Sequence, residues 1–370
     1  MTGPGLRISA IGVTIGLDLH RVEAQGRMDI ERSWQAAKVD HDSHDLILSA
    51  ALVGEENTSA DVLGGTVREL SALLSTRVTL AAIEQRKHEL VMLHACAIAL
   101  PEGDVVAFVG PSGRGKTTLA TALGRHFGYV TDETVGIAAD GTVLPYQKPL
   151  SVIDALDPGA KKQVSPAALG LRSLPDRALH IAAIVLLDRD DTAPEPPVVD
   201  DVDPVEALVR LVPELSYLPE LPNPLQRLAD LIDGVGGVRR LHYRESTSVP
   251  VLVPEIIGAQ RSTNWRPLPV ASFTSPSAEC YTRVQALDAI AIDEYAVLLL
   301  GSRVVVLDGI GPAIWDSLHD GPTLDVVVAR VLIAVGPAGD MDPSPLVIAA
   351  LDAMVDSGVV EYHNCAERTP

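Results

Sequence analysis

The chain of 370 residues is poor in cysteine, aromatic side chains and lysine. Its three cysteines, Cys96, Cys280 and Cys365, stand far apart without metal-site spacing, which indicates reduced thiols rather than a disulfide scaffold. Aromatic residues make up only 4%, so the cores must be built from Val, Leu, Ile and Ala. A chain of this length is expected to form two or three domains.

Long apolar runs and an excess of positive charge are also missing. No run approaches the roughly 18 residues of a membrane span, and the N-terminus lacks the pattern of a signal peptide, so we expect a cytoplasmic protein. The formal net charge is −20. Nucleic-acid and anionic-membrane binders need a basic face, so we expect neither kind of partner.

The stretch 105–118 carries the main chemical signal. An apolar run at 105–109 leads into the pattern G-x-x-x-x-G-K-[ST], and a helical pattern follows at 119–124. Backbone N–H groups of such a loop, at the positive end of a helix, form a cradle for phosphate. The sequence therefore predicts ATP and Mg²⁺, with Lys116 on the outer phosphates and the Thr117 hydroxyl on the metal. The residues predicted to bind the nucleotide here are Gly110, Ser112, Gly113, Arg114, Gly115, Lys116, Thr117 and Thr118.

The few lysines gather near this loop. Four of the six, Lys116, Lys148, Lys161 and Lys162, fall within 47 residues that start at the loop. Two predicted loops, 145–151 and 158–163, carry the last three, and loops of this kind often close over phosphates. This clustering predicts a local anion site that includes Lys148. The alternative is a chance cluster in a chain that prefers arginine.

Acidic residues interrupt a predicted strand at 128–137. Asp132 and Glu133 stand in its middle, where carboxylates are depleted and costly to bury. In a nucleotide enzyme such acids hold Mg²⁺ or accept a proton, and the alternative is a strand-end pair that faces water. Asp188 follows the apolar run 184–187 and is a further metal candidate. Which of the three acids contacts the metal stays open.

Two histidine patterns allow two interpretations each. His94 begins a predicted strand, 94–100, that pairs with 105–109, which brings its side chain near the phosphates; a purely structural role is the alternative. Five residues in a polar turn suggest a metal site, but neighbours in a turn point in different directions, so we interpret them as a solvated loop. They are Asp40, His41, Asp42, His44 and Asp45.

Pattern changes along the chain predict an α/β protein in four segments. Residues 1–85 form an N-terminal α+β region without a functional interpretation, and residues 86–245 form the nucleotide-binding domain. Residues 246–275, rich in Ser, Thr and Pro, form a linker. Residues 276–363 form a small module with a strand hairpin at 295–307, three helices and a closing strand.

His94, the loop 110–117 and the acid pair resemble, in order and spacing, the catalytic domain of HPr kinase/phosphorylase. That family has a histidine-led strand, a G-x-S-G-x-G-K loop and an acidic pair near the end of the next strand. The resemblance implies an HPr-kinase-like fold, transfer of the γ-phosphoryl group of ATP to a protein serine, and Asp132 as the proton acceptor. It covers about residues 90–160, and the second acid here is Glu133 where the family has Asp.

Residues 280–363 resemble the PqqD-like fold, a winged-helix-like module that recognises precursor peptides of ribosomal peptide-modifying enzymes. The features that carry this resemblance are the hairpin 297–307 and the segments 307–315, 319–323, 351–355 and 358–360. The resemblance implies capture of a leader peptide by strand addition.

Together these observations predict an ATP- and Mg²⁺-dependent kinase that phosphorylates a hydroxyl, a serine above all, of a precursor peptide. Lys116, Asp132, Glu133 and His94 are the predicted catalytic residues, and the predicted metal site comprises Thr117, Glu133 and Asp188. Two alternatives stay open: a nucleotide-gated peptide-binding protein without transferase activity, and a small-molecule kinase whose C-terminal module serves homo-oligomerisation.

Overall fold

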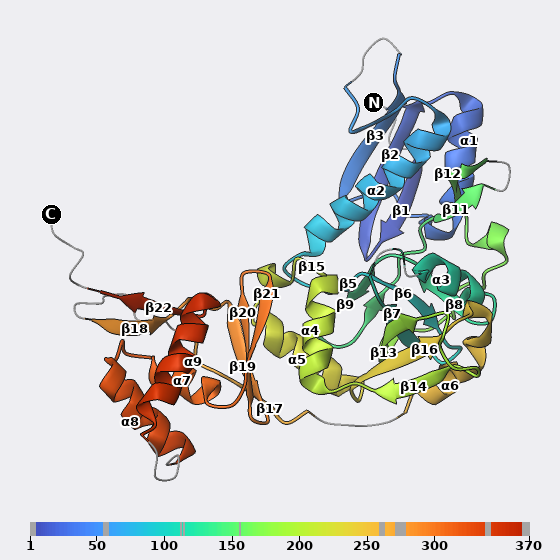
Figure 1. Cartoon of the computed structure of the whole chain (residues 1–370). Coiled ribbons are helices and arrows are strands. Elements are labelled where there is room, and N and C mark those ends of the chain that lie inside the picture. The colour runs from blue at the N-terminus through green and yellow to red at the C-terminus, as the bar shows by residue number, and fades with distance from the viewer. Residues whose placement is uncertain are drawn as a thin grey trace. The chain divides into compact units, whose positions relative to one another are not determined.

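The computed structural model describes residues 5–54, 59–111, 113, 115–154, 157–258, 263–270, 279–336 and 342–364, with the backbone alone at 154 and 157–160 (Figure 1). The chain forms two compact units. The first comprises residues 1–203, 214–221 and 231–262, and the second comprises residues 204–213, 222–230 and 263–370. This division differs from the predicted one, because two segments between 204 and 230 belong to the C-terminal unit.

The N-terminal part of the first unit is a four-stranded sheet with two helices, α1 (Ala24–Ser33) and α2 (Val67–Arg86). A two-residue turn with positive φ at Ile11 and Gly12 joins the first two strands, as a tight hairpin requires. Helix α2 begins at Thr66, whose hydroxyl accepts a hydrogen bond from the N–H of Glu69. The strands, in sheet order, are β1 (Leu6–Ala10), β2 (Val13–Arg21), β3 (Leu46–Leu52) and β4 (Val62–Gly64).

Side chains from these strands and helices form one buried core. Its members include Ile8, Ile15, Leu17, Trp34, Leu70 and Leu74. The short 3-10 turn Gln35–Ala37 follows α1. The polar turn that contains His41 and His44 is exposed throughout, in agreement with its interpretation as a solvated loop.

A six-stranded mixed sheet forms the centre of the first unit. Strands β7, β13 and β16 run parallel, and the outer strands are antiparallel to their neighbours. Helix α3 (Lys116–Gly124) packs on the sheet through Leu119 and Leu123, which join a core with Phe108 and Tyr129. The strands, in sheet order, are β14 (Val198–Asp201), β16 (Val238–Tyr243), β13 (His180–Arg189), β7 (Asp104–Val109), β6 (Ala95–Ala99) and β8 (Gly128–Thr131).

The predicted strand at 128–137 is broken in the structure. It ends as β8 at Thr131 and resumes as β9 (Val135–Ile137), so the acid pair lies in a bend between two strands. The Thr131 hydroxyl accepts hydrogen bonds from the N–H groups of Glu133 and Thr134 and stabilises this bend. The bend releases both carboxylates from the sheet, where their charge would be costly.

A second, smaller sheet lies beside the bend. Its strands, in sheet order, are β10 (Val143–Leu144), β9, β5 (Val91–Leu93) and β15 (Leu215–Ser216). Next along the chain, β11 (Leu150–Asp154) and β12 (Asp157–Val164) form a hairpin. Lys161 and Lys162, predicted on a loop, therefore lie on strand β12, and the 3-10 turn Ala167–Leu169 follows it.

The predicted linker 246–275 is partly built into the first unit. Its start forms the 3-10 turns Ser246–Ser248 and Pro250–Leu252 and the helix α6 (Val253–Ile256). Three apolar side chains of this segment are buried in the core of the central sheet: Val249, Val253 and Ile256. The composition of this segment is typical of a linker, but these three side chains anchor it to the sheet.

The second unit is an antiparallel sheet packed against helices. Strand β17 (Trp265–Pro267) pairs with β19 (Asp288–Ile292), which continues to β20 (Tyr295–Leu300) and β21 (Arg303–Leu307). Trp315 and Leu298 lie at the centre of its core. The remaining elements of this unit are α4 (Pro204–Leu211), the greater part of α5 (Pro224–Gly234), β18 (Cys280–Arg283), α7 (Gly311–Ser317), α8 (Leu324–Val335), α9 (Ser344–Asp356) and β22 (Val360–His363). The 3-10 turns Val212–Glu214 and Leu218–Glu220 lie between α4 and α5 in the sequence, and the second of them belongs to the first unit.

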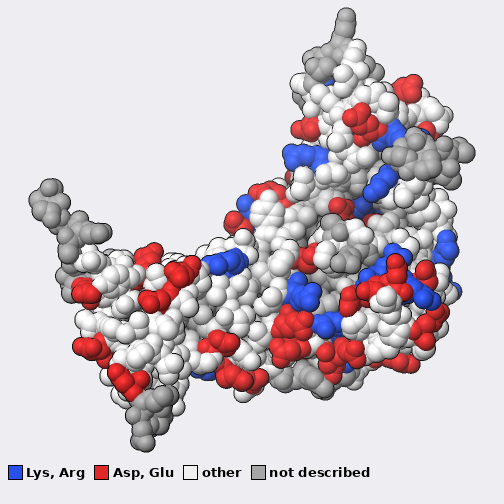
Figure 2. Space-filling view, in the orientation of Figure 1, with Lys and Arg blue, Asp and Glu red and all other residues white. Residues whose placement is uncertain are grey.

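The face of the protein shown in Figure 2 carries charges of both signs. On the face shown in Figure 2, basic side chains are interspersed with acidic ones over the described residues. Within the described ranges, every helix is too short or too polar to traverse a lipid bilayer.

Candidate functional site

The loop between β7 and α3 has the backbone that its glycine pattern predicts. Gly113 and Gly115 have φ of +84° and +85°, the left-handed region that glycine adopts most readily. At Gly110, a β-carbon would lie 3.2 Å from the β-carbon of Leu187, so glycine allows β13 to approach the loop closely. Ser112 and Arg114, also predicted to bind the nucleotide, lie outside the described residues.

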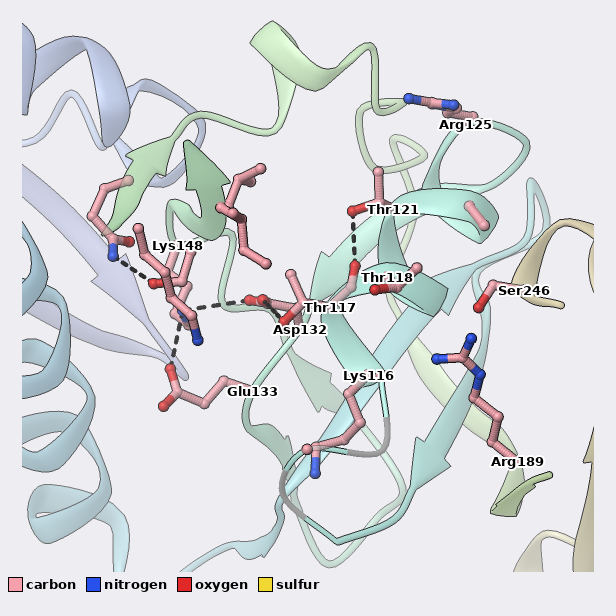
Figure 3. Close-up of a pocket in the computed structure, with 18 of the residues that line it drawn as sticks. Lys116, Thr117, Thr118, Thr121, Arg125, Asp132, Glu133, Lys148, Arg189 and Ser246 are labelled. Atoms are coloured by element: carbon pink, nitrogen blue, oxygen red, sulfur yellow. Dashed lines mark hydrogen bonds and ion pairs between the residues drawn. The ribbon is translucent and has the colours of Figure 1, made fainter. Parts of the chain in front are cut away.

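Lys116 begins helix α3 and folds back across the loop. Its side chain, labelled in Figure 3, is buried, and its Nζ donates a hydrogen bond to the carbonyl of Gly110. Burial lowers the pKa of Lys116, and the nearby carboxylates of Glu214 and Glu133 oppose this shift. An ammonium group in such a desolvated place attracts a phosphate more strongly than one in water.

Thr117 and Asp132 are in direct contact. The Thr117 Oγ1 donates a hydrogen bond to Asp132 Oδ2 over 2.9 Å, and the hydroxyl of Tyr129 donates one to Asp132 Oδ1 over 3.0 Å. The Asp132 side chain is only 3% exposed. Both of its oxygens are thus occupied, and the carboxylate adjoins the hydroxyl that is predicted to hold Mg²⁺.

Glu133 and Lys148 complete the same cluster, with Lys148 buried and Glu133 partly exposed. The Lys148 Nζ lies 3.1 Å from Glu133 Oε2 and 3.4 Å from Asp132 Oδ1. Burial disfavours the charge on Lys148, but the two carboxylates outweigh it and raise the pKa of this lysine above its ordinary value. The Glu133 side chain is 36% exposed, so its carboxylate is open to the cavity.

The N-terminal region contributes to this cluster through helix α2. The Thr79 Oγ1 lies 2.8 Å from the hydroxyl oxygen of Tyr146 and 3.4 Å from Glu133 Oε2. Ser75 and Thr76, one turn earlier, line the adjoining cavity. Residues 1–85 lacked a functional interpretation, and the structure shows that their second helix forms one wall of the site.

The cavity beside the loop has a volume of about 1030 Å³ and is bounded by α2, the β11–β12 hairpin, α3 and the segment after β16. Basic and imidazole side chains outnumber acidic ones on its wall, although the chain as a whole is strongly acidic. This wall suits an anionic ligand. Its titratable residues are His94, Lys116, Arg125, His126, Lys148, Lys161 and Arg189 on the basic side, and Asp132, Glu133 and Glu245 on the acidic side.

Of the two remaining candidates, His94 lies in the cavity wall and Asp188 lies elsewhere. His94 lines the cavity, where burial, with help from the charge of Lys116, lowers its pKa below the ordinary value, so its imidazole is neutral at pH 7. The Asp188 Oδ2 instead lies 2.9 Å from Nδ1 of His242, and Asp188 is not part of the cavity wall among the described residues. The structure thus leaves Asp188 apart and brings nine predicted residues together in the cavity wall: His94, Gly113, Gly115, Lys116, Thr117, Thr118, Asp132, Glu133 and Lys148.

Comparisons with known proteins find a likeness among solved structures. No protein-family model matches the chain, and no curated protein matches it. Among solved structures it is similar to the Hpr(Ser) kinase/phosphatase from Coxiella burnetii, at 13% identity over 45% of this chain and 92% of that chain, with a TM-score of 0.26. A likeness this loose carries no functional argument, so the function must be argued from the side chains of the site.

The residues at the loop fit Mg²⁺ bound together with a nucleotide. A hydroxyl and a carboxylate are the oxygen donors that Mg²⁺ prefers, and Thr117 and Asp132 supply them in direct contact. No cluster of three His, Cys, Asp or Glu with metal-binding geometry occurs among the described residues. Mg²⁺ in kinases commonly takes one or two protein ligands, with phosphates and water as the others, so two donors suffice.

Arg189 and Ser246 are two of the residues in the cavity wall that sequence reasoning missed. Successive side chains of a strand point to opposite faces, so the placement of Asp188 toward His242 turns Arg189 toward the loop. The strand pattern before position 188 could have indicated Arg189 as readily as Asp188. The segment that contains Ser246 is rich in Ser and Thr, which is typical of a linker, so its composition did not indicate that the segment packs against the sheet.

Proposed function

We propose that this protein is a kinase that transfers the γ-phosphoryl group of ATP, with Mg²⁺, to a hydroxyl group. One arrangement in the cavity carries this proposal. Thr117, on the phosphate loop, donates a hydrogen bond to Asp132, and the adjacent Glu133 is partly exposed to the same cavity. Phosphoryl transfer needs positioning and neutralisation of charge above all, and these residues supply both.

The loop and its lysine hold the nucleotide in this proposal. Loop amides and the positive end of α3 bind the phosphates, and Lys116 neutralises the outer ones. Thr117, held by Asp132, ligates Mg²⁺, which when bound neutralises the charge that develops on the transferred group.

We assign the two acids to tasks opposite to those predicted from sequence. Asp132 is buried with both oxygens bonded, so it suits the metal side of the site. Glu133 is open to the cavity, so it suits acceptance of the proton from an attacking hydroxyl. The Nζ of Lys148 lies 3.1 Å from Glu133 Oε2 and 3.4 Å from Asp132 Oδ1, so its charge offsets part of the repulsion between the two carboxylates.

The acceptor in this proposal is a serine of a precursor peptide that the C-terminal unit captures. Strand β21 pairs with β20, and among the described residues its other edge pairs with no strand, so an extended peptide can add there. A peptide tethered in this way reaches the active site at a high effective concentration, which relaxes the affinity that the active site itself must supply.

Incubation of the full chain with ATP, MgCl₂ and short peptides encoded beside its gene tests the proposal. A gain of one phosphate on a peptide serine, measured by mass spectrometry and absent with E133Q, supports the kinase. Peptide binding that depends on ATP but leaves the peptide mass unchanged supports a nucleotide-gated binding protein instead. Failure of ATP and ADP to bind the wild-type chain refutes both functions.

A further inference from the structure

Arg189 and Ser246 line one end of the cavity, away from the acid pair. Arg189 is the last residue of β13, and Ser246 comes shortly after β16, the neighbouring parallel strand. In Figure 3, Thr117 and Thr118 lie between these two residues and Asp132. This end of the cavity therefore carries polar side chains that have no role in the transfer step described above.

The Arg189 guanidinium is held against the backbone of the phosphate loop. Its Nε donates a hydrogen bond to the carbonyl of Arg244 over 3.1 Å, and its Nη1 lies 3.0 Å from the place of a β-carbon on Gly115. No carboxylate pairs with this guanidinium among the described residues, whereas Arg239, Arg244 and Arg330 each pair with an acid. Its outer nitrogens are thus left to an anion at the loop.

Ser246 lies in the same wall but is not open to a ligand. The residue is 5% exposed, its Oγ is buried, and its hydroxyl interacts with the buried hydroxyl of Tyr243. The contact with a ligand at this end of the cavity is therefore assigned to Arg189.

We infer that Arg189 binds the α-phosphate of the nucleotide and so sets its direction in the cavity. This inference rests on the proposed function, because transfer requires the γ-phosphate at the Glu133 side. Lys116 and the loop amides serve the β- and γ-phosphates. The remaining phosphate then lies toward Arg189, and the nucleoside lies near residues 245–250, which line the same end.

Titration calorimetry with ADP tests the inference, since ADP retains the α-phosphate and needs no acceptor. R189A should weaken ADP binding by about 10- to 100-fold, as expected for a lost hydrogen bond between charged groups.

Phosphorus NMR of saturated complexes then identifies the phosphate. R189K, which keeps a cation but loses the planar fork, should move the α-phosphorus resonance of bound ADP and leave the β-phosphorus resonance in place. R172A is the matched control: the Arg172 Nε also donates to a backbone carbonyl over 3.1 Å, and Arg172 does not line this cavity. R172A should bind ADP with wild-type affinity.

Four results would overturn the inference. Wild-type ADP affinity in R189A would remove this residue from the nucleotide site, and a raised KM for the acceptor alone would assign it to the acceptor; the proposed function survives either result. Movement of the β-phosphorus resonance instead would reverse the direction of the nucleotide. If the wild-type chain binds neither ADP nor ATP, the proposed function fails as well.

Discussion

The Oγ1 of Thr117 and the Oδ2 of Asp132 lie 2.9 Å apart in a hydrogen bond. This contact gives Asp132 a different environment from that of Glu133, the next residue in the sequence. Asp132 is tied to the phosphate loop and is 3% exposed, whereas Glu133 keeps 36% of its side chain exposed. A carboxylate without a vacant oxygen is a poor proton acceptor, and a partly solvated one beside a cavity is a better candidate. The two acids can therefore be distinguished by experiment.

Replacement of either acid by its amide should give different defects. D132N should weaken the Mg²⁺-dependent part of ADP affinity by about 10- to 100-fold, because it disturbs the partner of a metal ligand. E133Q should keep this affinity and lower the transfer rate by about 10²- to 10⁴-fold, the usual contribution of a general base. Calorimetry with and without MgCl₂, together with single-turnover phosphate transfer, measures both. The reverse pattern would restore Asp132 as the proton acceptor.

Lys148 should be essential for the stability of the first unit. K148M removes the cation between two carboxylates, one of them buried, and should lower the free energy of unfolding by about 3 kcal/mol. The double variant K148M/E133Q should recover part of this loss, because one of the two repelling charges is gone. K161M, on an exposed lysine of the same cavity, is the control and should change stability by less than about 0.5 kcal/mol. Urea unfolding followed by circular dichroism provides the measurement, and equal effects of the two lysine variants would contradict the prediction.

Local signals in the sequence predicted the phosphate loop and most of the strands around it. The loop at 110–117 is specified by glycines whose φ angles only glycine adopts easily, and the predicted strand at 105–109 is found as most of β7. In the second unit, the predicted hairpin at 295–307 is found as β20 and β21. These features depend on residues that are close in sequence.

Features that depend on distant residues were not predicted. The contact of Thr79 with Glu133 joins positions 54 residues apart, and no local pattern marks Thr79 as part of a site. The bend at Asp132 is another such case, since the apolar residues on both sides are typical of one continuous strand. The second unit likewise includes helices from 204–230, because Asp288 binds the start of α5 across 62 residues or more.

His94 should make the stability of the first unit depend on pH. Burial and the charge of Lys116 lower its pKa below 6.5, so below that pH the unfolded chain binds a proton that the folded chain does not bind. Wild-type protein should therefore lose stability relative to H94Q as pH falls from 7.5 to 5.5, with no difference in trend above pH 7.5. Urea midpoints at several pH values measure this, with H88Q, on an exposed histidine, as the control. A constant difference between wild type and H94Q over this range would contradict the prediction.

Asp288 should hold the second unit together through its contact with helix α5. Its Oδ2 accepts hydrogen bonds from the N–H groups of Leu225 and Gln226, and its Oδ1 accepts one from Nε2 of Gln226. The first N–H groups of a helix have no partner within the helix, and the buried carboxylate of Asp288 accepts hydrogen bonds from two of them. D288A should therefore lower the free energy of unfolding of this unit by about 2 kcal/mol.

Hydrogen exchange provides the measurement for this prediction, because two units need not unfold together. Amides of residues 225–230 should exchange about 30-fold faster in D288A, which corresponds to about 2 kcal/mol. D288N retains an oxygen acceptor and should show a smaller change. D352A, on an exposed acid of α9, should leave these amides unchanged. Since the capping bonds connect β19 to a segment that precedes it by more than 60 residues, equal exchange in D288A and wild type would mean that α5 belongs to the second unit through apolar packing alone.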